Sequence, residues 1–285
     1  MATFSLVYDV LRWEEKEIIK EAKQKGVAVD LINIKKIYFK IDPSLENKFL
    51  NELILQRCAS SIRRIYSTAI LEQGGAKVVN SFNTCLISSN KLLTNLALLK
   101  KGLPTPLAYA SFSEEACLES STHLNYPLVF KPVVGSWGRL VLRVKDSEEL
   151  KNLLEYRNYI NSMYKEIYYL QEFINKPSRD IRCIIVGDEV VALTYRYQAE
   201  KDFRTNVAIG GKVSEAKLNE EQIELFFKAK EAVEGEIVGI DAMEKQDQIL
   251  IHEVNSSVEF KGAYQVFGRK IVEKIVDYMV KLAKK

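Results

Sequence analysis

Short apolar runs alternate with helical patterns over the first 80 or so residues. Glu14 to Lys25 and Ile62 to Leu71 place apolar residues at helical spacing, and Gly74-Gly75 ends the second helix. The compact apolar runs favour strands at 4–7, 27–32, 53–56 and 78–79. Strands that alternate with helices predict a small α/β unit with parallel strands.

From about residue 90 the pattern changes to paired apolar runs around short turns. A helix over Lys91 to Lys101 is followed by Pro104 and Pro106, which indicate a link. Antiparallel hairpins are predicted for 126–131 with 140–144, 181–186 with 190–195, and 237–243 with 249–254. We therefore expect an α/β (α+β) fold in which a first unit with parallel strands is followed by a last unit that is built of antiparallel hairpins.

Two helices are predicted in the last unit. Asn219 and Gln222 have the spacing of a capping box, which predicts a helix that continues to Val233. The final 20 or so residues form one amphipathic pattern with an apolar stripe of Ile271, Ile275, Met279 and Leu282.

Composition excludes several classes of protein. The 285 residues are 47% hydrophobic and 28% charged, an ordinary globular balance. A net charge of +3 is too small for a protein that binds nucleic acid by bulk charge. No apolar run approaches the ~20 residues of a membrane span, and the N-terminus lacks the pattern of a signal peptide. Four separated cysteines and two histidines argue against a structural zinc site and fit a reducing, cytoplasmic setting.

One candidate site lies on the last predicted hairpin. Glu253 and Asn255 share one face of a strand because they are two residues apart, and Asp241 on the partner strand can reach them. Two carboxylates and a carboxamide oxygen suit Mg²⁺ that carries nucleotide phosphates. The alternative is a polar strand face in solvent. His252 precedes Glu253, so it should point away from it, and we interpret it as structural.

A glycine-rich loop forms the second candidate. Gly135 to Arg139 follow Lys131, and glycines let backbone N–H groups approach a phosphate closely while the lysine adds positive charge. The Walker A and Rossmann patterns are both absent. An ordinary hairpin turn is the alternative interpretation.

Arginines on the second hairpin form a third candidate, since guanidinium groups bind carboxylates and phosphates in a bidentate manner. They are Arg179, Arg182 and Arg196. The alternative is surface ion pairing with Asp180 or Glu189. A fourth candidate, from Arg204 to Gly211, is either a turn that faces substrate or a plain connector.

Taken in order, these signals resemble the ATP-grasp ligases, and within them the RimK-related LysX and ArgX ligases, which attach an amino acid to the carrier protein LysW. The resemblance covers nearly the whole chain. The stretches that carry it are YDVLRWEEK, GSWGRL, SRDIRC, RTNVAIGG and EVNSSVEFKG.

The resemblance implies an ATP-grasp fold, with an N-terminal pre-ATP-grasp domain at 1–88, a central lobe at 89–170 and a C-terminal lobe at 171–285. ATP would lie between the two lobes. The implied ATP contacts are Lys91, Lys131, Gly135, Ser136, Trp137, Gly138, Arg139, Leu140, Val141, Gln171, Glu172, Phe173, Ile174, Arg179 and Asn206. Backbone groups of Phe173 and Ile174 would read the adenine edge. Asp241, Glu253 and Asn255 would hold two Mg²⁺ ions.

The implied reaction proceeds through an acyl phosphate on the C-terminal glutamate of an acidic LysW-type carrier, which the amino group of a small acidic amino acid then attacks. Arg182 and Arg196 are the implied catalytic residues. The implied substrate contacts are Arg196, Val207, Ala208, Glu259, Phe260, Lys261, Gly262 and Ala263. The resemblance also implies a homodimer or homotetramer, since relatives are commonly dimers or tetramers.

The choice of amino acid remains open. In the family, the two residues after Glu-Phe-Lys are Gly-Phe for glutamate and Asn-Ser or Asn-Thr for 2-aminoadipate, whereas this chain has Gly262-Ala263. A phenylalanine would fill the pocket and Ala263 leaves room, which favours 2-aminoadipate; one methylene is worth only ~1–3 kcal/mol. The other hypotheses are a glutamate–LysW ligase, a RimK-type ligase of a protein tail or a small peptide, and a nucleotide-binding module with a decayed site.

Overall fold

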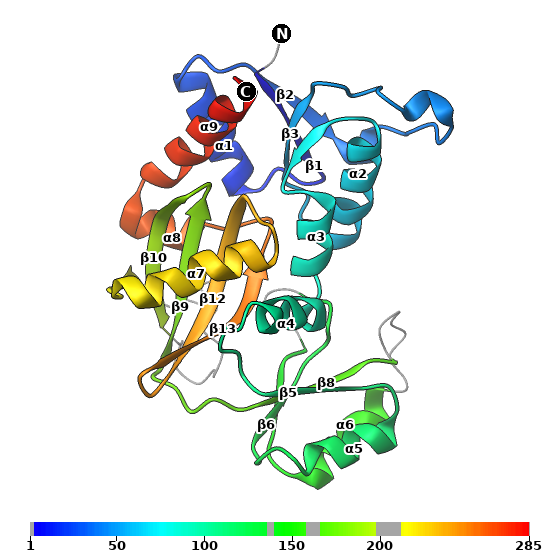
Figure 1. Cartoon of the computed structure of the whole chain (residues 1–285), viewed down its shortest axis with the longest axis vertical. Helices are drawn as coiled ribbons and strands as arrows, with labels where there is room; N and C mark the ends of the chain where they lie inside the picture. Colours follow the sequence, from blue (N-terminus) through cyan, green and yellow to red (C-terminus); the bar gives the residue numbers. More distant parts are fainter. Residues whose placement is uncertain (1–2, 136–139, 158–165, 198–211, 285) are drawn as a thin grey trace.

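The computed structural model describes residues 3–135, 140–157, 166–197 and 212–284. Its strands form three sheets, which follow one another along the long axis of the molecule (Figure 1). The mixed α/β architecture agrees with the fold class expected from the sequence.

The first sheet is parallel and has the strand order β2-β1-β3-β4, as the alternation of strands and helices predicts. Strand β3 matches its predicted range, whereas β2 begins two residues later than expected. The elements of this unit are β1 (Phe4–Tyr8), α1 (Trp13–Gln24), β2 (Val29–Asn33), β3 (Leu53–Gln56), α2 (Ser61–Gln73), β4 (Lys77–Val79) and α3 (Phe82–Ser88), with two 3₁₀ turns at Ile34–Lys36 and Pro43–Leu45.

The second sheet is antiparallel and has the order β5-β8-β6-β7. Its pairing of β6 with β7 confirms the first predicted hairpin. The elements are β5 (Ala108–Ser111), α5 (Glu114–Ser121), β6 (Leu128–Phe130), β7 (Leu142–Val144), α6 (Ser147–Arg157) and β8 (Tyr168–Glu172). Because β8 pairs only with β5 and β6, residues 171 and 172 continue this sheet beyond the unit limit placed after residue 170.

The third sheet has the order β11-β10-β9-β12-β13, and both of its predicted hairpins are confirmed. The capping box of α7 is also present, since Gln222 N donates to Asn219 Oδ1 at 2.9 Å and Asn219 N donates to Gln222 Oε1 at 3.1 Å. The elements are β9 (Arg179–Val186), β10 (Glu189–Tyr197), β11 (Val213–Glu215), α7 (Glu220–Ala232), β12 (Ile237–Lys245) and β13 (Gln248–Asn255).

The C-terminal helix joins the first and third sheets in one core. Along α9 (Lys270–Ala283), Ile271, Ile275 and Met279 are buried with Leu6 of the first sheet and Ile184 of the third. Helix α8 (Lys261–Phe267) precedes it, and α4 (Lys91–Lys100) lies against β13. Helix α9 thereby fixes the first unit relative to the third.

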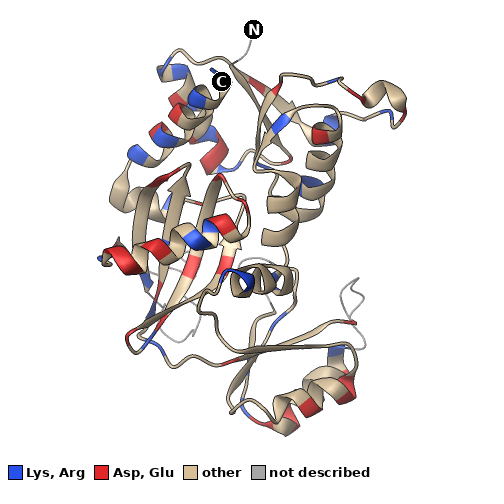
Figure 2. Ribbon diagram, viewed as in Figure 1, with Lys and Arg blue, Asp and Glu red and all other residues tan. Residues whose placement is uncertain are grey.

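Charges of both signs are interspersed along α7 and α9 (Figure 2), in keeping with the small net charge. Among the helices of the described ranges, none combines the length and the apolar character that a membrane crossing requires.

Candidate active site

Strands β12 and β13 bring together the three side chains that the sequence singles out for a metal. Asp241 lies opposite Glu253 in the antiparallel register. The Nδ2 atom of Asn255 is 3.4 Å from Asp241 Oδ2 and donates to it. Asp241 is buried, because β9 and β13 flank β12 on both sides.

Two arginines from neighbouring strands converge on Asp241. Arg182 Nε and Arg196 Nη2 each lie 2.6 Å from Asp241 Oδ1. Both arginines thus form an ion pair with Asp241, a partner that the sequence did not indicate. The cause is the β9–β12 register, which sets Arg182 opposite Asp241.

Arg179, the third arginine, is placed differently. Its Nε and Nη2 atoms lie 2.7 and 2.9 Å from the two carboxylate oxygens of Glu244, and its guanidinium lies over the Tyr195 ring at 3.8 Å from the centroid. A bidentate pair of this kind holds the arginine in place. These contacts do not test whether Arg179 contacts ATP, which remains a prediction.

The oxygen donors fit a hard divalent cation. Within the described ranges, the Glu253 carboxylate has neither an ion pair nor a hydrogen bond, and Asp241 Oδ2 accepts from Asn255 Nδ2. Burial opposes ionisation of Glu253, but Lys91, Arg182 and Lys131 outweigh it and lower the pKa of Glu253. Mg²⁺ is commonly bound by one or two carboxylates together with water and phosphate. The same ranges hold no cluster of three or more His, Cys, Asp or Glu side chains, so this set depends on the amide of Asn255.

His252 faces the same cavity as Glu253, which corrects the prediction that it points away. The register of β12 and β13 shifts between Asp241 and Ala242, which face Glu253 and Ile251, so His252 is the extra residue of a β-bulge. A bulge breaks the alternation of side chains along a strand. Burial lowers the pKa of His252 well below its usual value, and its Nε2 has no hydrogen-bond partner in the described structure.

Two lysines reach this region from the second unit and α4. Lys131 follows β6 and is only 5% exposed, with its Nζ 5.7 Å from the centroid of the Tyr169 ring. Burial and the positive charge of Lys91 lower the pKa of Lys131 to about 7. Lys91 Nζ donates to the carbonyl oxygen of Gly135 at 3.0 Å, which ties the start of the glycine-rich loop to α4.

The rest of that loop is described only in part. Ser136, Trp137, Gly138 and Arg139 lie outside the described residues, as do Asn206, Val207 and Ala208. Leu140 is exposed and has a positive φ of 59°. Closure of Gly135 to Val141 over phosphates stays a prediction.

The predicted adenine segment is anchored by Glu172. Its backbone N–H donates to Leu107 O at 2.9 Å, and its carboxylate accepts from Leu107 N and pairs with Lys245 Nζ at 2.8 Å. Gln171 and Ile174 are buried, and Arg143 lies over the Phe173 ring. These contacts join β8 to the end of the β12–β13 hairpin, at the boundary between the two lobes where the nucleotide is expected.

The segment expected to contact the amino acid is held by α1. Glu259 pairs with Arg12 at 3.1 Å, and the Lys261 N–H donates to Glu14 Oε1 at 3.3 Å. Phe260 is fully buried and packs edge-on against Trp13. Ala263 is 6% exposed and belongs to this core, whereas the Lys261 side chain is exposed. The side chains of this segment are thus positioned by the N-terminal unit.

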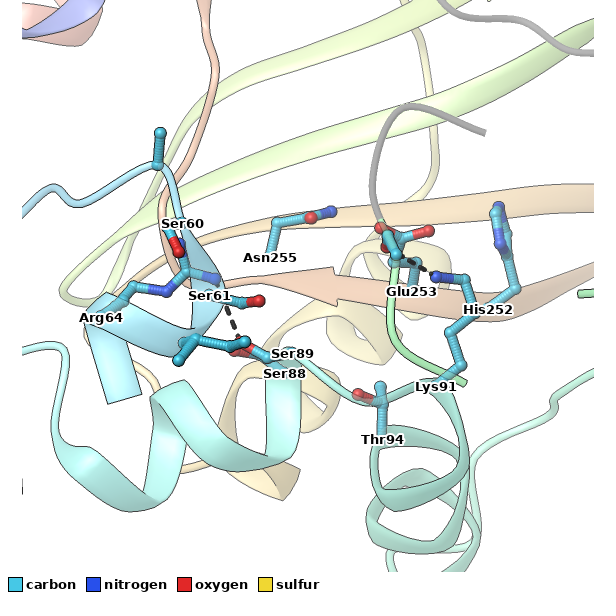
Figure 3. Close-up of a pocket in the computed structure, with 13 residues that line it drawn as sticks. Ser60, Ser61, Arg64, Ser88, Ser89, Lys91, Thr94, His252, Glu253 and Asn255 are labelled. Carbon is cyan, nitrogen blue, oxygen red and sulfur yellow. Dashed lines mark hydrogen bonds between the residues drawn. The ribbon is translucent and has the colours of Figure 1, made fainter. Parts of the chain in front are cut away.

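A cavity of about 250 Å³ lies between Glu253 and Asn255, two of the metal candidates, and the N-terminal unit. It lies just below the ~300–1,000 Å³ typical of small-molecule pockets. Sequence reasoning missed one side of it, because no motif marks residues of α2 and α3 as functional. Figure 3 shows both sides; the lining includes Lys91, His252, Glu253 and Asn255 on one side and Ser60, Ser61, Arg64, Ser88 and Ser89 on the other.

Comparisons with known proteins agree with this architecture. The family model of the LysX preATP-grasp domain matches residues 4–87, and that of the RimK-like ATP-grasp domain matches residues 88–279. Among solved structures, a RimK domain ATP-grasp protein from Sphaerobacter thermophilus has a TM-score of 0.79 at 20% identity and covers 96% of this chain and 98% of its own. The ATP-grasp ligase PsnB, complexed with a minimal precursor, has a TM-score of 0.75 at 15% identity and covers 100% of this chain and 99% of its own. At these identities the likeness establishes the fold.

Curated relatives narrow the group. An alpha-aminoadipate–LysW ligase LysX of Saccharolobus solfataricus is 37% identical over 276 residues, which is 95% of this chain and 99% of the relative. The LysX of Sulfurisphaera tokodaii is 37% identical over 283 residues, 98% of this chain and 99% of the relative. A glutamate–LysW ligase ArgX of Sulfolobus acidocaldarius is 34% identical over 278 residues, 96% of this chain and 97% of the relative. The chain is therefore an ATP-dependent ligase that belongs to the RimK-like ATP-grasp family and, within it, to the LysX/ArgX group.

Proposed function

We propose that this ligase joins the amino group of 2-aminoadipate to the γ-carboxylate of the C-terminal glutamate of a LysW-type carrier protein, with conversion of ATP to ADP and phosphate, in lysine biosynthesis. The observation that carries this proposal is the concentration of cationic groups around two carboxylates and one amide. Arg182, Arg196 and Lys131 surround the Asp241–Glu253 pair. Such a site suits a reaction between anionic groups.

The reaction has two steps. An oxygen of the carrier carboxylate forms a bond to the γ-phosphorus while the bond from that phosphorus to the β,γ-bridging oxygen breaks, so ADP leaves. The amine nitrogen then attacks the acyl carbon, phosphate leaves with the electrons of the C–O bond, and the nitrogen loses a proton. The first step brings two negatively charged groups together, and both steps depend on position and positive charge.

The residues of this chain fit those needs. Asp241, Glu253 and Asn255 would hold the magnesium. Mg²⁺ supplies charge neutralisation at the phosphate oxygens when it is bound. Arg182 and Arg196 keep Asp241 in place and, together with Lys91 and Lys131, give the site more positive than negative groups. Neutral His252 offers no proton at neutral pH, in agreement with its lowered pKa.

The arrangement of units supports the same proposal. We propose that 1–88 holds substrate while 89–170 and 171–285 enclose the nucleotide with two Mg²⁺ ions, and that the enzyme is a homodimer or homotetramer. The contacts of Arg12, Glu14 and Arg57 with residues 258–261 support a role of the N-terminal unit in substrate placement.

The choice of 2-aminoadipate over glutamate is supported by the two LysX relatives at 37% identity. The ArgX relative at 34% keeps glutamate as the second candidate. A site discriminates between two substrates that differ by one methylene by about 1–3 kcal/mol, or 10- to 200-fold. The ratio of kcat/KM for the two amino acids is therefore the decisive quantity.

The test is an amino-acid panel with purified carrier. ADP release is measured at equal concentrations of 2-aminoadipate, glutamate and aspartate, and the carrier is weighed by mass spectrometry. We expect ADP release only when carrier, Mg²⁺ and amino acid are all present, with 2-aminoadipate preferred. A carrier without its terminal glutamate is the matched control. Absence of turnover with every amino acid, or addition of glutamate to a different protein tail, would overturn the proposal.

A further inference from the structure

Arg64, on α2, is a buried cation for which the described residues supply no carboxylate. It is 9% exposed; Nη1 donates to Cys58 O at 2.8 Å and Nη2 to Ser89 Oγ at 3.0 Å. Its Nε is buried and has no hydrogen-bond partner among the described residues. Buried charges are normally paired, because desolvation without a counter-charge is costly. Arg12 and Arg57 add to the positive potential at Arg64.

The start of α2 adds a second anion-binding element beside this guanidinium. Ser60 is the N-cap of this 13-residue helix, and the N–H groups of Ser61 and Ile62 in its first turn have no acceptor within the helix. Asp9 already accepts from the N–H groups of Ala59 and Ser60, and Arg63 offsets its charge. A helix N-terminus favours an anion through these N–H groups and the helix dipole.

Both elements line the cavity that Glu253 and Asn255 also line. Ser60, Ser61 and Arg64 line one side, and Lys91 and Glu253 line the other (Figure 3). A small molecule in this space would present one end to Arg64 and the opposite end to the phosphate and metal region.

We propose that Arg64, held by Ser89, and the first turn of α2 form a subsite for a carboxylate that does not react. This inference rests on the proposed function, in which both substrates carry such a group: the α-carboxylate of the carrier's last residue, and the two carboxylates of the amino acid. A guanidinium beside backbone N–H groups matches the paired oxygens of a carboxylate.

The test compares Arg64→Lys and Ser89→Ala with Arg63→Lys, a neighbouring arginine whose partner is Asp9. KM is measured for the carrier, the amino acid and ATP. Each enzyme is also assayed with three analogues, in which one carboxylate is an amide: the α-amide of the amino acid, its side-chain amide, and a carrier with an α-amidated C-terminus.

We expect Arg64→Lys to raise KM for one substrate by about 10- to 100-fold, as loss of a charged hydrogen bond does, and Ser89→Ala to raise it by about 3- to 10-fold, while KM for ATP is unchanged. For that substrate, replacement of the carboxylate by an amide should raise the KM of the wild type by the same factor as Arg64→Lys does. The same analogue should not raise the KM of Arg64→Lys any further. The analogue whose effect on KM is not additive with that of Arg64→Lys identifies which carboxylate occupies the subsite.

Other outcomes overturn the subsite. One is an unchanged KM in Arg64→Lys and Ser89→Ala, and another is an equal loss of kcat with all substrates. A third is that the effect of Arg64→Lys on KM multiplies with the effect of the amide for all three analogues. Thermal unfolding reports whether Arg64→Lys is folded; if it is not, Ser89→Ala and the amides with wild-type enzyme decide. A wild-type enzyme without turnover on carrier and amino acid would instead contradict the proposed function.

Discussion

Arg57 and Glu15 form an ion pair that is shielded from solvent, with Nη2 of the arginine 2.8 Å from Oε1 of the glutamate. Neither side chain is more than 2% exposed. Arg57 also donates from Nη2 to the carbonyl oxygen of Val258 at 2.9 Å. A pair within the N-terminal unit thereby fixes the backbone that leads into Glu259 and Lys261, where we expect the amino acid.

Removal of one member of this pair should be costly. Arg57→Met leaves Glu15 buried with only Arg12 as its partner, and a broken buried ion pair costs about 3–5 kcal/mol of unfolding free energy. The double variant Arg57→Met/Glu15→Leu should lose less than the sum of the two single variants. Urea unfolding of the four proteins measures this, and strict additivity would show that the two charges do not interact.

A second contact between units depends on Asn80, which follows β4. Its Nδ2 donates to Ile237 O at 2.6 Å and Ser256 O at 2.8 Å, and its Oδ1 accepts from Glu236 N at 2.7 Å and Ile237 N at 3.0 Å. The side chain is buried, and all its hydrogen-bonding capacity is used. Asn80 thus fastens both ends of the β12–β13 hairpin to the first unit.

Asn80→Ala should lower the free energy of unfolding by about 3 kcal/mol or more, because it leaves buried backbone groups without partners. Asn80→Asp should cost still more, since a carboxylate would face two carbonyl oxygens. The matched control is Asn83→Ala, an exposed position three residues on, with an expected change within about 0.5 kcal/mol. Equal effects of Asn80→Ala and Asn83→Ala in thermal and urea unfolding would contradict this account.

Features encoded by near neighbours in the sequence could be predicted. The parallel first sheet, the three hairpins and the Asn219–Gln222 capping box depend on local periodicity and turn residues, and all are present. The approach of Asp241 to Glu253 and Asn255 also followed, because a hairpin and strand alternation suffice to place them.

Features that depend on distant packing could not be predicted. The bulge at His252 is invisible in the alternation of ILIHEV, and the partners of Arg182 and Arg196 follow from the order of strands in the third sheet. In the sequence, nothing distinguishes Arg64 from other helical arginines, because its contact with Ser89 depends on how α3 packs beside α2. Helix α8 was missed because its seven residues are too few for a periodic signal.

Lys131 should make nucleotide binding dependent on pH. Its pKa in the folded protein is about 7, below the ordinary 10.5, because burial and Lys91 disfavour the ammonium form. An anionic phosphate favours that form, so MgATP binding at pH 8 should take up close to one proton, and much less at pH 6.

Calorimetry in buffers with different ionisation enthalpies measures that uptake, and Lys131→Met should abolish it. The sign for stability follows from the same shift: the unfolded chain binds the proton more tightly, so the contribution of Lys131 to unfolding free energy should rise with pH between about 7 and 10.5. Equal proton uptake in wild type and Lys131→Met would remove Lys131 from the nucleotide site.

The amide in the metal set should be as necessary as the carboxylates. Glu253→Gln and Asn255→Ala each remove an oxygen donor or its charge without emptying the core, so we expect ADP release to fall to background while the thermal transition stays close to that of the wild type. Glu189→Gln is the control, because this carboxylate also lies on the third sheet but pairs with Lys274 at 2.6 Å.

Because Asn255 also donates to Asp241, Asn255→Asp separates the two roles of the amide: it keeps an oxygen and loses the donor. Partial activity in Asn255→Asp with none in Asn255→Ala supports a metal ligand, whereas full activity in Asn255→Ala or Glu253→Gln would exclude these side chains as ligands.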